Sequence, residues 1–369
     1  MANILKNVDK IITGSGTEVD LDNIQASGGG AAGLEGSGIA YSTDGTDEFY
    51  DAGSSSELIA LDIDNPQDGE GLVYHAASQT WKNAEISFGP TATGGTEFDD
   101  LVNGYKYHLF TESDADGLTM NLTTNIEILL IAGGGGGGAG YYGGGGGAGG
   151  LIHTSFVLPV GIYPVQIGGF GAGSVSTSTQ GGDGGPSTFH TYTAIGGGGG
   201  GSRHTSVNSG RDGGSGGGCA HEGHSSGSGT AGQGNDGGGG NSGEYGGGGG
   251  GAGASPVDGF YTDPNYSAHG QNGGVGLDFS DWANATSTGH NGFYAGGGAG
   301  GSDSILRTGG IGGGGNGGTN AGDIGTHGLV NTGGGGGGGS SVESWSGAIT
   351  AIGAGKNGGS GILIIRYTI

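Results

Sequence analysis

The pattern of apolar and polar positions predicts short β-strands, one of which runs directly into glycine. Residues 126–131 read IEILLI, and β-favouring aliphatic residues at this density are typical of a strand that is buried on at least one face. Residues 133–138 and 143–147 then consist only of glycine. Glycine costs about 1 kcal/mol per position in an α-helix, so these runs are not helical, and without side chains they form no hydrophobic core.

Further segments with a β-like pattern lie on both sides of this strand. Before it, short strands are predicted at residues 11–13, 18–21, 57–63, 71–75, 79–86, 106–110 and 118–122. After it, residues 151–158 and 162–167 are predicted to form a hairpin around residues 159–161, and residues 188–195 a single strand. Residues 361–369 (GILIIRYTI) are expected to pair with residues 127–131 and close a small sheet. No segment keeps a 3.6-residue period, so we expect little helix.

Two structures fit the glycine runs. Glycine-rich sequence is most often a disordered linker, but glycine also allows polyproline-II-like helices to pack side by side, with each amide bonded to a neighbour. Short polar or aromatic segments separate the runs, as in a chain that goes out, turns and returns, and this arrangement favours the packed structure. The seven runs of four or more glycines are residues 133–138, 143–147, 196–201, 237–240, 246–251, 312–315 and 333–339.

Glycine content also marks a domain boundary. From position 133 onward 88 of 237 residues are glycine, against 17 of the first 132. We therefore predict a mainly β protein, in which a small antiparallel β-sheet domain carries an inserted layer of packed polyglycine helices. Residues 1–90 would form a β-rich attachment or trimerisation region, residues 91–132 the strands that lead into the tip, and residues 133–369 the glycine-rich tip, closed by residues 361–369.

Charge and cysteine content narrow the possible partners and compartments. The formal net charge is −25, from 34 acidic and 9 basic residues, so no basic stripe is available for nucleic acid. We interpret the acidic residues, concentrated in the N-terminal third, as a solvated surface. A single cysteine, Cys219, excludes an intramolecular disulfide. The first residues lack the apolar core of a signal peptide, and no apolar run reaches the ~18 residues that span a membrane, so we expect synthesis in a cytoplasm.

No pattern in the sequence predicts an enzyme, a cofactor or a bound metal. An enzyme needs converging acids, bases or nucleophiles, and no H-E-x-x-H element is present. His221 and His224 lie near Cys219, but an exposed polar loop is favoured over a zinc site, which needs three or four ligands at motif spacing. Residues 114–117 (DADG) are interpreted as a turn rather than a calcium loop.

Large aromatic residues occur where the glycine runs pause, among them Tyr141, Tyr142 and Trp345. Tyrosine and tryptophan suit a recognition surface because they supply large contact area at low entropy cost. Alternatively, the rings cap the ends of the glycine layer and supply the apolar burial that glycine lacks. We expect the contacts in the longest inserts, residues 255–266 and 278–288. The candidate receptor-binding residues are Tyr245, Phe260, Tyr261, Tyr266, Trp282, Phe293, Tyr294, His221 and His224.

The order of these segments resembles a known family. The stretch EILLIAGGGGGGAGYYGGGGGAGG, the later TYTAIGGGGGG and the terminal GGSGILIIRYT are similar to the glycine-rich domain at the ends of bacteriophage tail fibres, especially of marine and cyanobacterial phages. This resemblance covers about residues 96–369. The glycine runs alone are similar to the tail-fibre adhesins of T-even-like phages, whose tip is a stack of polyglycine helices with variable loops. The segment GLVYHAASQTWKN resembles a short repeat of phage fibre proteins.

The resemblance implies a tail-fibre subunit of a virion, an adhesin that binds a host receptor through loops at its glycine-rich tip. The implied partners are a host surface polysaccharide or outer-membrane protein and other virion tail or fibre proteins. Residues 1–90 have few apolar residues per strand, so we expect a homotrimer or docking onto another virion protein. The rival hypothesis is a structural virion or matrix fibre, or an ice-binding polyglycine protein, without specific receptor binding.

Overall fold

The computed structural model divides the chain into two compact units, Met1–Gly89 and Pro90–Ile369. In the first unit it describes the backbone of the strands alone. In the second it describes residues 91–369 except 204–206, 221–223, 241–244, 257–271, 303–305, 320–324 and 344–348, with backbone only in strands β20 (Val342–Glu343) and β21 (Ile349–Ala351).

The unit Met1–Gly89 contains eight short strands in its described parts. Strands β1 (Lys10–Ile12) and β2 (Glu18–Asp20) form an antiparallel pair. The other six form a sheet in the order β3-β4-β5-β6-β8-β7. Their bounds are β3 Ala32–Gly33, β4 Ile39–Tyr41, β5 Glu48–Asp51, β6 Leu58–Asp62, β7 Glu70–His75 and β8 Thr80–Glu85. The strands predicted at residues 11–13, 18–21, 57–63, 71–75 and 79–86 are therefore confirmed.

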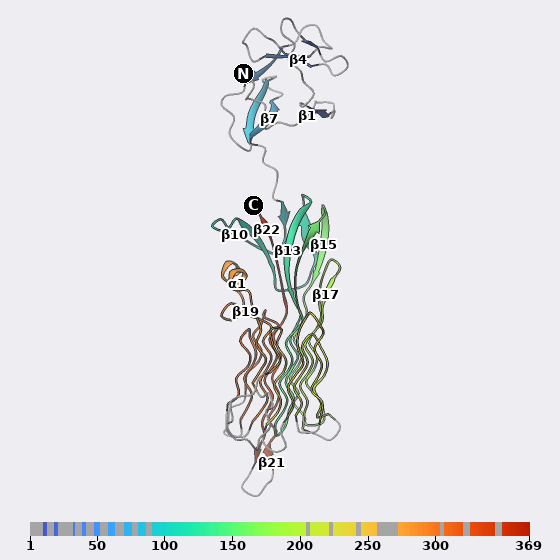
Figure 1. The fold of residues 1–369 in the computed structure, drawn as a ribbon, viewed down its shortest axis with the longest axis vertical. Helices are drawn as coiled ribbons and strands as arrows, with labels where there is room; N and C mark the ends of the chain where they lie inside the picture. Colours follow the sequence, from blue (N-terminus) through green and yellow to red (C-terminus); the bar gives the residue numbers. More distant parts are fainter. Residues whose placement is uncertain are drawn as a thin grey trace. The chain divides into compact units, whose positions relative to one another are not determined.

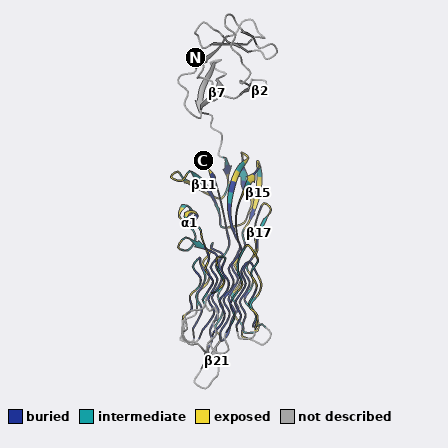
Figure 2. Ribbon diagram, in the orientation of Figure 1, coloured by how far each residue is buried: buried dark blue, intermediate teal, exposed yellow. Residues whose placement is uncertain are grey.

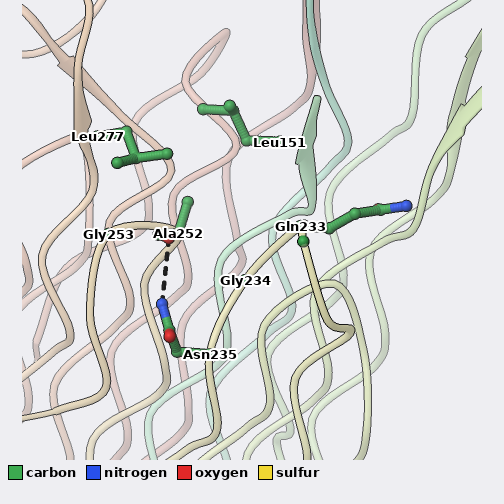
Figure 3. Close-up of a pocket in the computed structure, with 8 residues that line it drawn as sticks. Leu151, Gln233, Gly234, Asn235, Ala252, Gly253 and Leu277 are labelled. Atoms are coloured by element: carbon green, nitrogen blue, oxygen red, sulfur yellow. Dashed lines mark hydrogen bonds between the residues drawn. The ribbon is translucent and has the colours of Figure 1, made fainter. Parts of the chain in front are cut away.

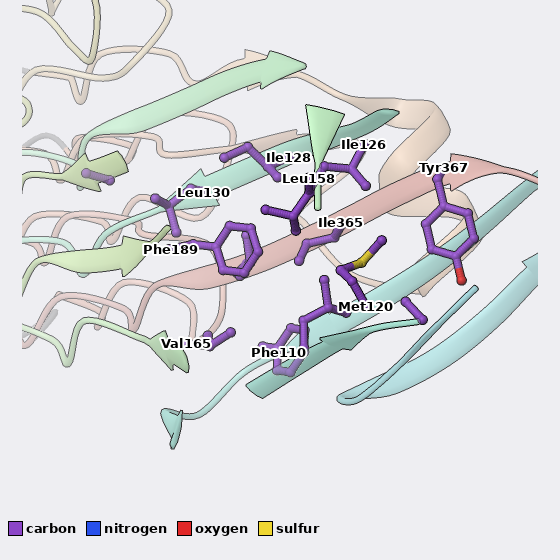
Figure 4. Close-up of a cluster of buried hydrophobic side chains, with 14 of the residues drawn as sticks. Phe110, Met120, Ile126, Ile128, Leu130, Leu158, Val165, Phe189, Ile365 and Tyr367 are labelled. Atoms are coloured by element: carbon purple, nitrogen blue, oxygen red, sulfur yellow. The ribbon is translucent and has the colours of Figure 1, made fainter. Parts of the chain in front are cut away.

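The unit Pro90–Ile369 contains two five-stranded antiparallel sheets that together form a sandwich (Figure 1). The first has the order β10-β11-β22-β13-β14 and the second β17-β16-β15-β12-β9. The bounds are β9 Ala92–Thr93, β10 Thr96–Asp100, β11 Tyr105–Phe110, β12 Asp114–Met120, β13 Thr124–Ile131, β14 Leu151–Leu158, β15 Gly161–Gln166, β16 Ser187–Phe189, β17 Tyr192–Ala194 and β22 Ile362–Thr368. Buried side chains of both sheets, including Met120, Ile128 and Phe189, share one hydrophobic core (Figure 4).

The apolar strand β13 occupies a central position in the first sheet. It pairs antiparallel with β22, from Glu127 opposite Arg366 to Ile131 opposite Ile362, which confirms the predicted closure by the last strand. One face of β13 lies in the core between the sheets. The other face, with Leu129 and Ile131, lies in a second core that also contains residues of helix α1 (Ser280–Thr286). Burial on both faces explains why residues 126–131 are almost continuously apolar.

Two predictions about strand pairing were wrong. Strands β14 and β15 do not form a hairpin, because β14 pairs with β13 in the first sheet while β15 pairs with β12 and β16 in the second. The residues between them cross from one sheet to the other. Residues 188–195 are not one strand, because β16 and β17 form a hairpin whose turn contains His190 in a left-handed conformation, with φ of 52°.

The glycine-rich segments lie between strands of the sandwich in sequence. We call the described parts of residues 132–150, 167–186, 195–276 and 295–361 the glycine layer. Its segments run side by side away from the sheets and are largely buried (Figure 2). The described residues contain one α-helix, α1, flanked by the short strands β18 (Leu277–Asp278) and β19 (Phe293–Tyr294). The fold is thus mainly β, with antiparallel sheets in this unit.

Candidate functional site

The amides of residues 143–150 show how the glycine layer is held together. They donate to three neighbouring segments in turn, and each neighbour is used again three residues later. Gly143, Gly146 and Gly149 donate to Gly339, Gly336 and Gly333; Gly144, Gly147 and Gly150 to Gly201, Gly198 and Ile195; Gly145 and Ala148 to Gly247 and Gly250. These N–H···O distances are 2.7–2.9 Å. The backbone is therefore satisfied although the segment belongs to no sheet.

The carbonyls of the same segment repeat the pattern with three other neighbours. They accept hydrogen bonds from residues 132–138, from residues 215–218 and from residues 298–301. Residues 143–150 are thus bonded to six surrounding segments. A side chain has no room among them, because a Cβ atom added at Gly146 would collide with the carbonyl of Gly135. Side chains that could contact a partner are therefore confined to the turns and the outer segments.

The turns far from the sandwich define what we call the loop end, which comprises the described residues 139–142, 175–179, 202–203, 207–208, 245, 302, 306–307 and 340–341 (Figure 1). Two neighbouring turns are tied together there, since Ala139 N donates to Ser202 Oγ (2.7 Å) and Arg203 N to Ala139 O (3.1 Å). The guanidinium carbon of Arg203 lies 4.9 Å from the ring centre of Tyr141 and 5.4 Å from that of Tyr142. The two buried rings meet edge to face, and Arg203 is exposed above them.

A second arginine–tyrosine pair lies at the same end. The guanidinium carbon of Arg307 is 4.9 Å from the ring centre of Tyr245. Arg307 is 6% exposed, and its Nε has no hydrogen-bond partner within the described structure. The Tyr141 hydroxyl is likewise buried without one. No carboxylate of the described residues forms an ion pair with Arg203 or Arg307.

A family model described as a glycine-rich domain matches residues 114–368, which include seven of the ten strands of the sandwich and the whole glycine layer. The chain belongs to this glycine-rich domain family. No curated protein matches the chain. The matched region begins in β12 and ends in β22, so it holds strands of both sheets together with the glycine layer, while β9, β10 and β11 precede it.

The glycine-rich domain places Trp282 at the end opposite the loop end, which corrects our expectation that residues 278–288 form an exposed recognition loop. Trp282 lies on α1, is 3% exposed, and its ring lies 4.4 Å from the guanidinium carbon of Arg366. Arg366 also contacts the Tyr105 ring and donates to Glu127 (2.8 Å). Trp282 is buried because α1 folds back onto the outer face of the first sheet, where it completes the second core.

The remaining candidate residues are distributed over both ends of the domain. Phe293 and Tyr294 belong to β19 near α1, and Tyr294 is fully buried. The Tyr294 hydroxyl bonds to Thr288 Oγ1 (2.6 Å), and burial raises the pKa of this tyrosine. His224 is exposed, and Tyr245 is buried at the loop end. Phe260, Tyr261, Tyr266 and His221 lie outside the described residues, as does Trp345.

The glycine-rich domain also has a cavity of about 270 Å³ between Leu151, Gln233, Asn235, Ala252 and Leu277 (Figure 3). The amide side chains that line this cavity already form hydrogen bonds within the protein. Gln233 accepts from Ile195 N (2.8 Å) and donates to Thr193 O (3.1 Å). Asn235 Nδ2 donates to Gly251 O (2.8 Å) and Ala252 O (3.1 Å). These amides join neighbouring segments, so the cavity offers little chemistry for a ligand.

Sequence reasoning missed Arg203 and Arg307. The chain has only four arginines, and this low number could have drawn attention to each of them as a candidate binding residue. No sequence motif marks Arg203 or Arg307. In the described ranges no three His, Cys, Asp or Glu side chains gather to hold a metal ion. No helix in the part of the chain that the structure describes has the length and apolarity to cross a membrane.

Proposed function

We propose that this chain is a bacteriophage tail-fibre subunit that binds a host cell-surface receptor through the loop end of its glycine-rich domain. The observation that carries the proposal is the contrast within the glycine layer. Its interior accepts no side chains, while its turns bring arginine and tyrosine side chains together at one end. A scaffold bonded to neighbours on six sides would hold such residues with little loss of entropy on binding.

We further infer that the segments of the glycine layer are polyglycine II helices. Hydrogen-bond partners that recur every third residue fit the three residues per turn of this helix. No glycine of runs 133–138 and 143–147 has a positive φ, as expected for its left-handed form. Residue-resolved density or NMR relaxation should find residues 196–201 and 333–339 ordered. Mobile coil at these residues would overturn the inference.

The receptor class follows from the resemblance to phage fibres: a surface polysaccharide or an outer-membrane protein. We assign residues 1–90 to attachment, either as a homotrimer or by docking onto another tail or fibre protein. These assignments account for a chain in which a β-rich N-terminal unit precedes a separate compact domain.

Cell binding and location on a particle test the proposed function together. Antibodies against the full chain should label tail fibres in electron micrographs of phage particles that contain it. The purified chain should bind a subset of bacterial strains and block adsorption of that phage to them. Labelling away from any fibre, or adsorption unchanged by saturating chain, would reject the proposal. Inhibition of ice recrystallisation without cell binding would favour the ice-binding alternative.

A further inference from the structure

The loop end carries two arginines that no carboxylate of the described residues neutralises. Three of the four other lysine and arginine side chains that the structure describes are held by carboxylates: Lys106 by Glu97 and Asp99, Arg211 by Asp183, and Arg366 by Glu127. Arg203 and Arg307 have no such partner among the described residues, although the chain has 34 acidic residues. Both instead lie against tyrosine rings.

This placement preserves the ability of Arg203 to bind an anion. Contact with a ring engages the guanidinium through its charge and its flat surface, and it consumes none of the N–H donors. Those donors form a planar fork that matches the oxygens of a carboxylate or phosphate. Arg203 is exposed, so its fork is open to solvent. Its backbone N donates to Ala139 O, and its guanidinium carbon lies against the rings of Tyr141 and Tyr142.

Two buried polar groups at the loop end also favour a bound anion. The ring of Tyr141 lies 4.9 Å from the Arg203 guanidinium carbon, Tyr141 is 8% exposed, and its hydroxyl has no hydrogen-bond partner among the described residues. Arg307 is 6% exposed, and its Nε likewise has no partner among them. Burying donors without acceptors costs free energy, and an unpaired buried cation costs more. A bound anion would supply negative charge at this end of the layer, close to these buried groups.

We propose that the loop end binds an anionic cell-surface glycan, with Arg203 as the exposed anchor on Tyr141 and Tyr142, and Arg307 on Tyr245 adding positive potential. This rests on the proposed function and names its receptor class. The shared chemistry is a sugar polymer that carries carboxylates or phosphates. Uronic-acid polysaccharides and the phosphorylated core of lipopolysaccharide are the two sources of that chemistry.

The test measures binding of the full chain to three probes: polygalacturonate, lipopolysaccharide micelles and neutral dextran. We expect binding to at least one of the first two, none to dextran, and weakening with ionic strength. Arg203→Gln should weaken binding roughly tenfold or more, because it removes a charge-assisted hydrogen bond. Arg211→Gln is the matched control, since it removes the same charge from an exposed arginine already paired with Asp183. It should leave binding unchanged, and the melting temperature of both variants should stay near wild type.

Other results would overturn the inference. Equal loss in both variants would show that only net charge matters. Binding of wild-type chain to bacterial strains but to neither acidic probe would refute an anionic glycan and leave the proposed function intact. Failure to bind any strain or any probe would reject both. Preference for polygalacturonate or for lipopolysaccharide would identify the source of the anion.

Discussion

In the interior of the glycine layer, glycine is required because neighbouring segments leave no room for a side chain, and not because the backbone has a positive φ. Gly146 donates to Gly336 and accepts from Gly298, and a Cβ atom on it would collide with the Gly135 carbonyl. Gly169 provides a contrast in the same layer, because a Cβ atom there would meet no atom within 4 Å. Neither residue has a positive φ.

Gly146→Ala should therefore lower the free energy of unfolding by about 1–3 kcal/mol, the usual cost of overpacking. The obstructing atoms are backbone, which cannot rotate away. Gly169→Ala should have no cost, or a small stabilising effect, because alanine restricts the unfolded chain. Denaturant unfolding of the two variants beside wild type measures both effects. Equal stability of the two variants would contradict the packed arrangement.

His108 should make the sandwich sensitive to acid. It is fully buried, its Nδ1 lies 2.8 Å from Gly94 O and its Nε2 3.1 Å from the Tyr367 hydroxyl. Burial lowers its pKa, against a smaller opposing effect of the Gly94 carbonyl. The unfolded chain then takes up the proton first, so stability should fall as pH drops below about 6.5 and until it reaches the lowered pKa.

Thermal melting between pH 7.5 and 5 tests this expectation. His108→Gln removes the titrating group and should show a smaller decline in melting temperature over the same interval, even if it is less stable throughout. The difference between the two slopes isolates His108 from the other nine histidines. Parallel slopes would show that His108 keeps an ordinary pKa in the folded protein.

At the scale of elements, α1 acts as a cover for the outer face of the first sheet. Its Trp282 contacts Tyr107 edge to face, with ring centres 5.9 Å apart, and lies near His153. Leu129, Ile131 and Ile364 of the sheet complete the same core. This element resembles a structural cap, which was the alternative considered for the aromatic residues.

Trp282→Ala should consequently reduce stability by roughly 3–5 kcal/mol, as truncation of a buried aromatic residue does. Cell binding by the folded fraction should stay unchanged, because α1 lies at the sandwich end of the domain. Phe170→Ala, at a residue 52% exposed, is the control and should cost little. Measurements at low temperature separate binding from unfolding. If fully folded Trp282→Ala protein lost cell binding, Trp282 would be part of the receptor-binding site after all.

At the scale of the molecule, the last strand enters a sheet next to β13, which ends about 230 residues earlier in the sequence. β22 lies between β11 and β13 and is bonded to both. The glycine layer, together with β14–β17 and α1, thus lies in sequence between two adjacent strands of one sheet, β13 and β22. The N-terminal unit is separate and consists, in its described parts, of short strands.

We predict that the full chain is a trimer and that residues 90–369 alone are a folded monomer. The strands of Met1–Gly89 have three to six residues for the most part and few apolar side chains, so association would supply the missing buried surface. Sedimentation of both proteins, with circular dichroism of the shorter one, measures this. A monomeric full chain would reject the trimer and leave docking onto another tail or fibre protein as the role of residues 1–90. A trimer formed by residues 90–369 would show that residues 1–90 are not the trimerisation region.

Local patterns in the sequence predicted much of the architecture. The apolar run at residues 126–131, the terminal strand and the interruptions of the glycine runs were enough to predict a closed sheet with returning segments. They could not show that β14 and β15 belong to different sheets, because an alternating pattern says which side of a strand is buried and not which strand lies beside it. The φ of His190, which splits residues 188–195, depends on the same pairing.

The sequence by itself determined that binding residues must lie outside the glycine runs, since glycine has no side chain to offer. Which residues remain available was decided by tertiary structure alone. Trp282 and Arg203 both stand in short polar or aromatic segments, yet one is covered by the sheet and the other lies exposed on two tyrosines. Exposure and ion pairing depend on residues distant in sequence, and no local pattern encodes those neighbours.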